Sequence, residues 1–149
     1  MMKIRKVVTG HNHKGKDVVK WDDEIEAIPG RAGFSFVPLW ATKQLPAKLT
    51  EEDPHTWEIG TSIAGGSVSR IARYELGVAK RNHQTDSLDD AVVLSGEIWM
   101  QLDEEEVHMK AGDVMIQRGT MHNWVNRGTE PCIIAFILIA TEGGQATGW

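Results

Sequence analysis

The chain of 149 residues has little cysteine, no block of basic charge and no long apolar run. Its single cysteine, Cys132, rules out an intrachain disulfide and is typical of a reducing compartment, so we expect a cytoplasmic location. Cys132 opens an apolar segment, which favours a buried structural thiol over a nucleophile. The longest apolar run, 132–140, is too short to cross a membrane. The first residues also lack the apolar core of a signal peptide.

Charge and length narrow the function classes further. The 16 Lys and Arg residues are outnumbered by 21 Asp and Glu residues, and they form no basic cluster, so we expect no nucleic-acid partner. The length suits one domain with a proper core, over residues 1–149. Within it we expect an N-terminal hairpin and edge strands over about 1–60, core motifs over about 77–126, and a loose glycine-rich tail over about 141–149.

The hydrophobic pattern predicts short strands and no helix. Two β-branched runs, 3–9 and 17–21, flank a Gly/Asn-rich turn and predict a hairpin. Residues 34–42 predict a strand in which Pro38 requires a sheet edge or a bulge, because proline donates no ladder hydrogen bond. Residues 68–76 predict another strand, and its alternation leaves open which face looks inward. Short strands separated by turns indicate an all-β sandwich or barrel.

Two polar segments, 77–89 and 112–126, each carry a histidine, and a hairpin-like stretch lies between them. A strand points alternate side chains to one face. That alternation places His83 with three polar neighbours of the same parity and His122 with Trp124. Small antiparallel barrels build internal sites from such strands when these fold over one another. We therefore expect one interior site that includes Thr85, Ser87, Asp89 and the two histidines.

The two segments resemble the paired motifs of the cupin family. Gly77, His83, Asp89 and Gly96 fall at the spacing of the first motif, with Thr85 in place of its second histidine and aspartate in place of its glutamate. The second motif is matched by Gly112, Gly119, His122 and Asn126, with Arg118 where proline is usual and a turn one residue shorter. The resemblance implies an antiparallel cupin barrel (double-stranded β-helix, or jelly roll) with the hairpin as an N-terminal extension.

The resemblance also implies a function. Cupins hold a divalent metal, which gives His83, Asp89 and His122 as a two-histidine, one-carboxylate set for Fe, Mn, Ni or Zn. Loss of the third imidazole also allows an empty site in which a histidine acts as general base, tuned by the carboxylate. The candidate pocket residues are Thr85, Ser87, Met100, Trp124 and Arg118. The implied reactions are those of a dioxygenase, decarboxylase, isomerase or dehydratase. The implied substrate is a small carbonyl- or carboxylate-containing molecule, aromatic compounds included, and fold alone does not choose among the reactions.

Plainer explanations stand beside these. The barrel can also be a non-catalytic binding module that has lost its metal, and the family resemblance makes a homodimer the expected assembly. Trp124 suits a core position as well as a substrate wall, and Arg118 suits an exposed turn as well as a carboxylate clamp. His108 alternates with Lys110 on one face, which favours a solvated side chain over a ligand.

Overall fold

The computed structural model describes residues 2–148, which form antiparallel strands and one short 3-10 helix. The all-β prediction is confirmed. The strands are β1 (Lys3–His11), β2 (Asp17–Glu26), β3 (Ile28–Pro29), β4 (Phe34–Thr42), β5 (Ser67–Tyr74), β6 (Ser87–Ser95), β7 (Glu97–Gln101), β8 (Glu106–Lys110), β9 (Val114–Arg118), β10 (Asn123–Val125) and β11 (Cys132–Ala140), and the helix η1 spans Pro54–Thr56.

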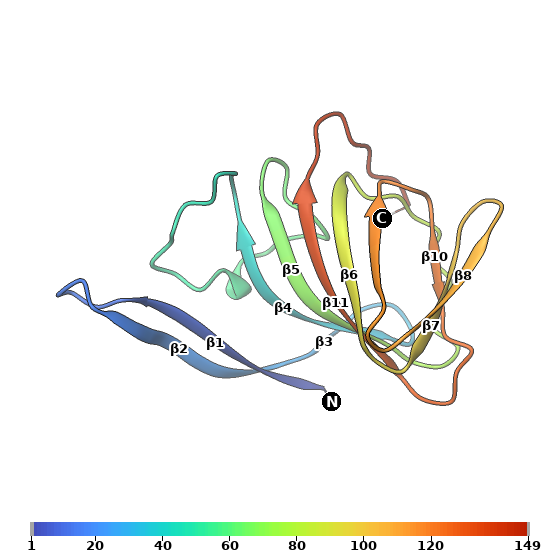
Figure 1. Cartoon of the computed structure of the whole chain (residues 1–149), viewed down its shortest axis with the longest axis horizontal. Helices are drawn as coiled ribbons and strands as arrows, with labels where there is room; N and C mark the ends of the chain where they lie inside the picture. Colours follow the sequence, from blue (N-terminus) through green and yellow to red (C-terminus); the bar gives the residue numbers. More distant parts are fainter. Residues whose placement is uncertain (1, 149) are drawn as a thin grey trace.

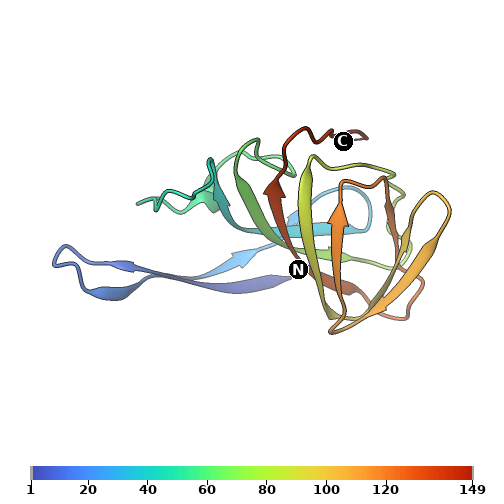
Figure 2. The ribbon, with the colours of Figure 1, turned by 45° about the horizontal axis from the view of Figure 1, so that its top comes forward.

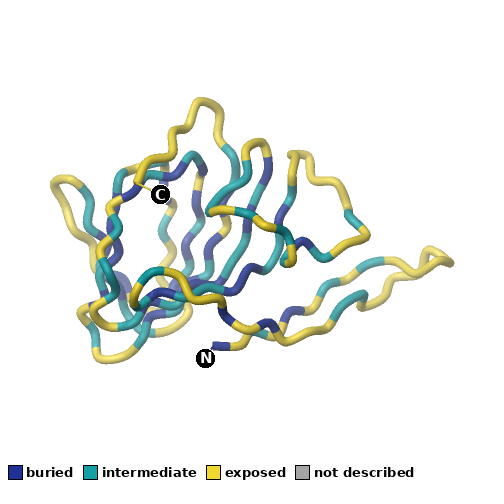
Figure 3. Tube along the Cα trace, turned by 180° about the vertical axis from the view of Figure 1, so that it is seen from behind, coloured by how far each residue is buried: buried dark blue, intermediate teal, exposed yellow. Residues whose placement is uncertain are grey.

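The N-terminal hairpin, β1 and β2, projects away from the body of the protein (Figure 1). The two runs and the turn between them were predicted, but β2 continues to Glu26, beyond the predicted strand. The outer end of the hairpin is exposed on both strands (Figure 3). It therefore adds little to the core and presents its edges to other molecules.

Two sheets enclose the core. A six-stranded sheet has the order β3-β4-β5-β11-β6-β9, and a three-stranded sheet has the order β10-β7-β8. The last strand, β11, lies between β5 and β6, so the chain's C-terminal part completes the wall begun much earlier (Figures 1 and 2). The strands of the small sheet curl opposite this wall, as expected for a jelly-roll barrel.

Pro38 explains an irregularity in β4. The register between β4 and β5 shifts between Pro38 and Trp40, as the sequence predicted for a proline inside a strand. On its other side β4 pairs only with the two-residue β3, opposite Ser35 and Phe36, so Pro38 needs no ladder partner there. Pro38 itself lies opposite Arg70 in the pairing of β4 with β5.

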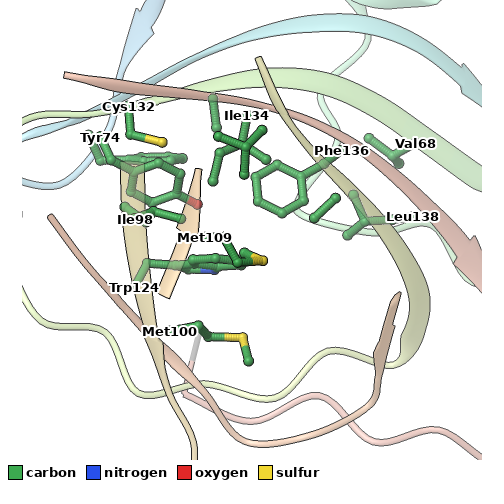
Figure 4. Close-up of a cluster of buried hydrophobic side chains, with 14 of the residues drawn as sticks. Val68, Tyr74, Ile98, Met100, Met109, Trp124, Cys132, Ile134, Phe136 and Leu138 are labelled. Atoms are coloured by element: carbon green, nitrogen blue, oxygen red, sulfur yellow. The ribbon is translucent and has the colours of Figure 1, made fainter. Parts of the chain in front are cut away.

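The inner face of β5, which the sequence left open, carries Val68, Arg70, Ala72 and Tyr74. The three uncharged residues among them belong to the main core cluster. Figure 4 shows Trp124, Met100 and Met109 of the small sheet opposite Ile134, Phe136 and Leu138 of β11. Full burial of a side chain such as Ile134 contributes roughly 2 kcal/mol, so this cluster is the main source of stability.

The turn between β6 and β7 depends on Gly96. Its φ is +75°, and a Cβ atom there would lie 2.5 Å from the carbonyl oxygen of Pro131. Any other residue would both strain the backbone and collide with the segment before β11. The first-motif glycine thus permits the close approach that brings β6 and β11 together.

The outer face of the large sheet is only partly covered. Met2, Ile25 and Ala27 from the start of the chain pack over Val37 and Ile71 on β4 and β5. Farther along, apolar side chains of three neighbouring strands remain exposed; we call this set the outer apolar face: Leu88, Leu94, Val114, Ile116 and Ile137.

The tail beyond β11 is exposed but held at its end. Thr147 forms a bridge with Gln84, and the carbonyl oxygen of Gly148 accepts a hydrogen bond of 3.3 Å from Arg81 Nε. The tail was predicted to be loose over 141–149, and its last residue, Trp149, lies outside the described residues. Within the described chain, no helix is long and apolar enough to cross a membrane.

Candidate active site

His83 and His122 lie on two short extended segments that pair directly with each other. The amide of His83 donates to the His122 carbonyl at 3.0 Å, and the amide of His122 donates to the His83 carbonyl at 2.9 Å. A pair that exchanges both hydrogen bonds directs its side chains to one face. The two ring centroids are 4.2 Å apart, with the planes tilted by 50°. The fold thus joins the two histidines that the sequence separates.

The hydrogen bonds of the rings fix their tautomer. Nδ1 of His83 lies 3.0 Å from the carbonyl oxygen of Arg81, and Nδ1 of His122 lies 2.8 Å from that of Thr120. A carbonyl oxygen only accepts, so each Nδ1 must carry the proton. In each neutral ring the lone pair then sits on Nε2, which has no hydrogen-bond partner in residues 2–148. Two basic nitrogens are therefore available to a ligand.

Burial keeps both imidazoles neutral. It lowers the pKa of His83 to about 4, despite the carbonyl bond that favours the protonated ring, and the nearby His122 lowers it further. Burial also lowers the pKa of His122. Both side chains are almost fully enclosed, 7% and 3% exposed. At neutral pH the pair therefore offers lone pairs rather than positive charge.

Asp89 lies on β6 among buried hydroxyl groups. Thr85 donates to one carboxylate oxygen at 3.1 Å and Ser87 to the other at 2.5 Å. All three side chains are buried, as their shared parity predicts. Burial raises the pKa of Asp89 to about 6, against the lowering effect of the two hydroxyls. Asp89 therefore exchanges its proton close to neutral pH, which suits acid–base chemistry.

Trp124 and Met100 form a packed floor beside the histidines. They face each other in the pairing of β10 with β7, and both are buried in the core. The Trp124 ring meets that of His122 edge to face, with centroids 5.8 Å apart and planes at 83°. It also lies 5.9 Å from the ring of Tyr74. These residues position the imidazole and limit water on that side.

Comparison with known proteins places this geometry in a family. The family model for the cupin domain matches residues 75–139. The cupin-domain-containing oxidoreductase fogC of Aspergillus ruber is 31% identical over 93% of this chain and 73% of its own length. The chain belongs to the cupin family. A second fungal relative of this cupin, phomopsin biosynthesis cluster protein C' of Diaporthe leptostromiformis, is 39% identical over 80% of this chain and 69% of its own.

Solved structures agree on the fold. The cupin domain of Cnp3 from Schizosaccharomyces pombe has a TM-score of 0.57 at 12% identity, over 92% of this chain and 88% of that one. The polyketide cyclase RemF from Streptomyces resistomycificus has a TM-score of 0.57 at 14% identity, over 83% and 79% of the two chains. At these identities the likeness establishes the cupin architecture alone.

Within residues 2–148, the side chains of this cupin do not assemble a three-ligand metal site. The two Nε2 atoms are suitable ligands, but Thr85 stands where the family has a further histidine. Both oxygens of Asp89 are engaged by neighbouring hydroxyls. Among residues 2–148, no group of three or more His, Cys, Asp or Glu side chains is placed to hold a metal ion. The two imidazoles are the donors that the structure brings together, and Asp89 as a third ligand stays a prediction.

Arg118 is the predicted pocket residue that the fold places elsewhere. It ends β9 opposite Leu88 and is exposed, next to the outer apolar face. Its neighbour Gln117 is buried on the inner side. Successive side chains on a strand point to opposite faces, so an inward Gln117 requires an outward Arg118. Arg118 points outward because side chains alternate along β9. The sequence did not show this, because the turn after Arg118 is one residue shorter than in the family motif.

Two inner-face residues were missed by sequence reasoning. Gln117 lies opposite Asp89 in the pairing of β9 with β6, and its Oε1 atom is buried without a hydrogen-bond partner in the described chain. Arg70 points inward from β5, and its Nε is likewise buried and unpartnered there. In the sequence, each of these polar residues shares the parity of apolar residues on its strand. That pattern could have identified them only if the inward face of each strand had been known.

Proposed function

We propose that this cupin is an enzyme that acts on a small carbonyl- or carboxylate-containing molecule in the barrel, with His83 or His122 as general base. The observation that carries the proposal is the imidazole pair with both Nδ1 protons held by backbone carbonyls. A fixed tautomer keeps an Nε2 lone pair free to accept a proton, which is the geometric requirement of a general base. The reaction class that fits best is proton transfer next to a carbonyl, as in isomerisation or dehydration.

Each group has a role that follows from its environment. An Nε2 lone pair accepts the substrate proton next to the carbonyl, and because burial disfavours the imidazolium, the ring gives that proton back to the product in the second half of the reaction. We assign to Asp89, in its protonated form, the donation of a proton to the substrate oxygen, which it takes back when the carbonyl re-forms; its pKa of about 6 keeps a fraction of the group protonated at neutral pH. Thr85 and Ser87 hold the carboxyl in place. Trp124 supports His122 and excludes water.

The relatives support small-molecule chemistry. Two of those with 30% identity or more are named cupin-domain-containing oxidoreductases, and two are named phomopsin biosynthesis cluster proteins. These names do not fix a substrate for this chain. They favour an enzyme that modifies a small organic molecule over a purely structural cupin.

Solvent deuterium incorporation tests the proposal. The protein is incubated in deuterated buffer with a panel of aliphatic and aromatic keto acids and ketones, and exchange is followed by NMR. We expect at least one compound to exchange, with a loss of about 10²–10⁴-fold in His83→Gln/His122→Gln. His108→Gln is the matched control, because His108 is exposed and stacks on Trp99 outside the site. Unchanged exchange in the double variant would refute the base assignment.

The alternative is a binding module without turnover. It predicts that the panel compounds bind but none exchanges or is converted, in wild type and variants alike. The acid–base character of Asp89 and the free Nε2 atoms favour the enzyme, because a barrel that only sequesters a ligand needs neither.

A metal-assisted version stays open because the two Nε2 atoms are suitable ligands. Such a metal (Fe, Mn, Ni or Zn) would bind through His83 and His122 and polarise the substrate oxygen. We place it second because, among residues 2–148, no group of three or more His, Cys, Asp or Glu side chains is placed to hold a metal ion. Stoichiometric metal in untagged protein, lost in His122→Gln, would reverse this order.

We further propose that two copies of the chain associate through the outer apolar face. Ile137 and Ile116 flank Asp90 in adjacent strands, and Val114 continues the same face. Several exposed apolar side chains gathered on one face of a sheet are typical of an interface. Ile116→Glu should convert a dimer to a monomer in analytical ultracentrifugation, and a monomeric wild type would refute the proposed dimer.

A cytoplasmic location remains our prediction from the lone cysteine.

A further inference from the structure

Arg70 is a charged side chain inside the barrel without a partner. It lies on the inner face of β5, between Val68 and Ala72. Its Nε is buried, and within residues 2–148 the guanidinium makes no hydrogen bond and no ion pair. Its Cζ lies 5.4 Å from the centroid of the Phe36 ring, within reach of a cation–π contact. A buried guanidinium nitrogen without a hydrogen-bond partner is costly and requires an explanation.

A shortage of carboxylates does not explain why Arg70 has no ion-pair partner. The chain has a net charge of −5, and Arg5, Arg73 and Arg127 each pair with a carboxylate. Two other arginines near the interior, Arg31 and Arg81, donate Nε to the carbonyls of Ala79 and Gly148. Arg70 donates to neither a carboxylate nor a carbonyl in the described chain. Its donors are therefore left for a group that comes from outside.

A cavity adjoins the Arg70 side chain. Its volume is about 450 Å³, within the range of small-molecule sites. Phe36 and Pro38 of β4 form one side, and Trp57 and Ile59, which follow η1, form another. Glu58 also borders the cavity, but it is exposed and forms no ion pair with Arg70. The lining is thus mostly apolar and partly aromatic, and its polar groups are the Arg70 guanidinium, the His55 ring and the Glu58 carboxylate.

The inner face links this cavity to the candidate active site. Arg70 on β5 is paired with Phe136 on β11. On its other side Phe136 is paired with Ala91 on β6, two residues from Asp89. Arg70 and Asp89 sense each other's charge, although they do not form an ion pair. A ligand held by Arg70 would therefore contact the same inner wall of the large sheet that carries Asp89.

We propose that Arg70 binds the carboxylate of a small, flat organic acid whose apolar part lies against Phe36 and Trp57. The planar fork of guanidinium donors matches a carboxylate and forms strong charge-assisted hydrogen bonds. The proposal names the substrate class for the site described above, and in that respect it rests on the proposed function. The binding itself does not depend on His83 or His122.

A matched acid and amide test the proposal. Binding of 2-naphthoate and of uncharged 2-naphthamide is measured by calorimetry for wild type, Arg70→Met, Arg70→Lys and Arg73→Met. Arg73 is the control because it lies on the outer face of the same strand and pairs with Glu75. We expect wild type to prefer the acid at least tenfold. Arg70→Met should lose this preference, Arg70→Lys should retain part of it, and Arg73→Met should behave as wild type.

Stability separates a binding role from a structural one. Removing an unpartnered buried charge should leave the melting temperature of Arg70→Met unchanged or raise it. Equal acid binding by Arg70→Met and Arg73→Met would overturn the proposal. So would a wild type that does not prefer the acid, or that binds it undetectably. A marked fall in the melting temperature of Arg70→Met would assign Arg70 a structural role instead.

The His83→Gln/His122→Gln variant keeps the two proposals distinguishable. If it retains 2-naphthoate binding but loses exchange activity, both stand. If it retains exchange activity, the base assignment fails while the Arg70 site stands on its binding data. If Arg70→Met binds the acid as well as wild type does, the Arg70 site fails whatever the histidines do.

Discussion

Burial of His83 makes a quantitative prediction about stability at acidic pH. In the unfolded chain the ring has its ordinary pKa of 6.5, and burial lowers the pKa in the folded protein to about 4. The folded pKa is the lower one, so the contribution is fully present above pH 6.5 and is lost as pH falls towards 4. Each unit between the two pKa values corresponds to 1.36 kcal/mol. Between pH 7.5 and 4.5, wild type should lose about 2.5 kcal/mol through this residue alone.

The wild-type profile alone would not show this, because Asp89 acts in the opposite direction. The pKa of Asp89 rises on folding from 3.8 to about 6, so its contribution is present at low pH and is lost as pH rises through 6. The measurement is therefore a difference. Urea unfolding is followed by tryptophan fluorescence for wild type and His83→Gln across this range, and the two free energies of unfolding are subtracted at each pH.

The free energy of unfolding of wild type minus that of His83→Gln should fall by about 2.5 kcal/mol between pH 7.5 and pH 4.5. His13→Gln, changed in the exposed turn of the hairpin, controls for replacing an imidazole with an amide. A difference that stays constant with pH would show that His83 is solvated in the folded state. The buried pair described above would then be wrong.

The remaining predictions concern the carboxyl group and the missing ligand. Asp89→Asn should show the opposite pH trend, gaining about 2 kcal/mol relative to wild type from pH 4.5 to 7.5, and urea unfolding at each pH checks this. Equal slopes for the two proteins would contradict the raised pKa. Thr85→His, which restores the family ligand, should tighten Ni²⁺ binding at least tenfold by calorimetry, because a third imidazole completes the set. Unchanged affinity would show that position 85 does not face Nε2 of the histidines.

Alternation along strands explains how much of this site could be predicted. The shared parity of His83, Thr85, Ser87 and Asp89 was visible in the sequence, and all four side chains are buried together. The hairpin and the Pro38 bulge were also predictable, because turn residues and proline act locally. Local chemistry thus fixed the elements and their faces.

Longer-range packing decided the parts that could not be predicted. On β5 both faces carry apolar side chains, since Met2 and Ile25 cover the outer one, and the pattern therefore did not reveal that Arg70 points inward. The spacing of Asp89 showed a possible ligand, but not that Thr85 and Ser87 would occupy its oxygens. The inward direction of Arg70 depends on which segments meet in space, and the hydroxyl contacts of Asp89 depend on the exact backbone path over residues 85–89.

The tautomer of the two buried imidazoles tests the central claim most directly. Long-range nitrogen–proton NMR correlation on ¹⁵N-labelled protein at pH 7, assigned with His83→Gln and His122→Gln, reports which ring nitrogen carries the proton. We predict a proton on Nδ1 and a free lone pair on Nε2 in both rings. A proton on Nε2 of both rings, or two charged imidazolium rings, would contradict the account.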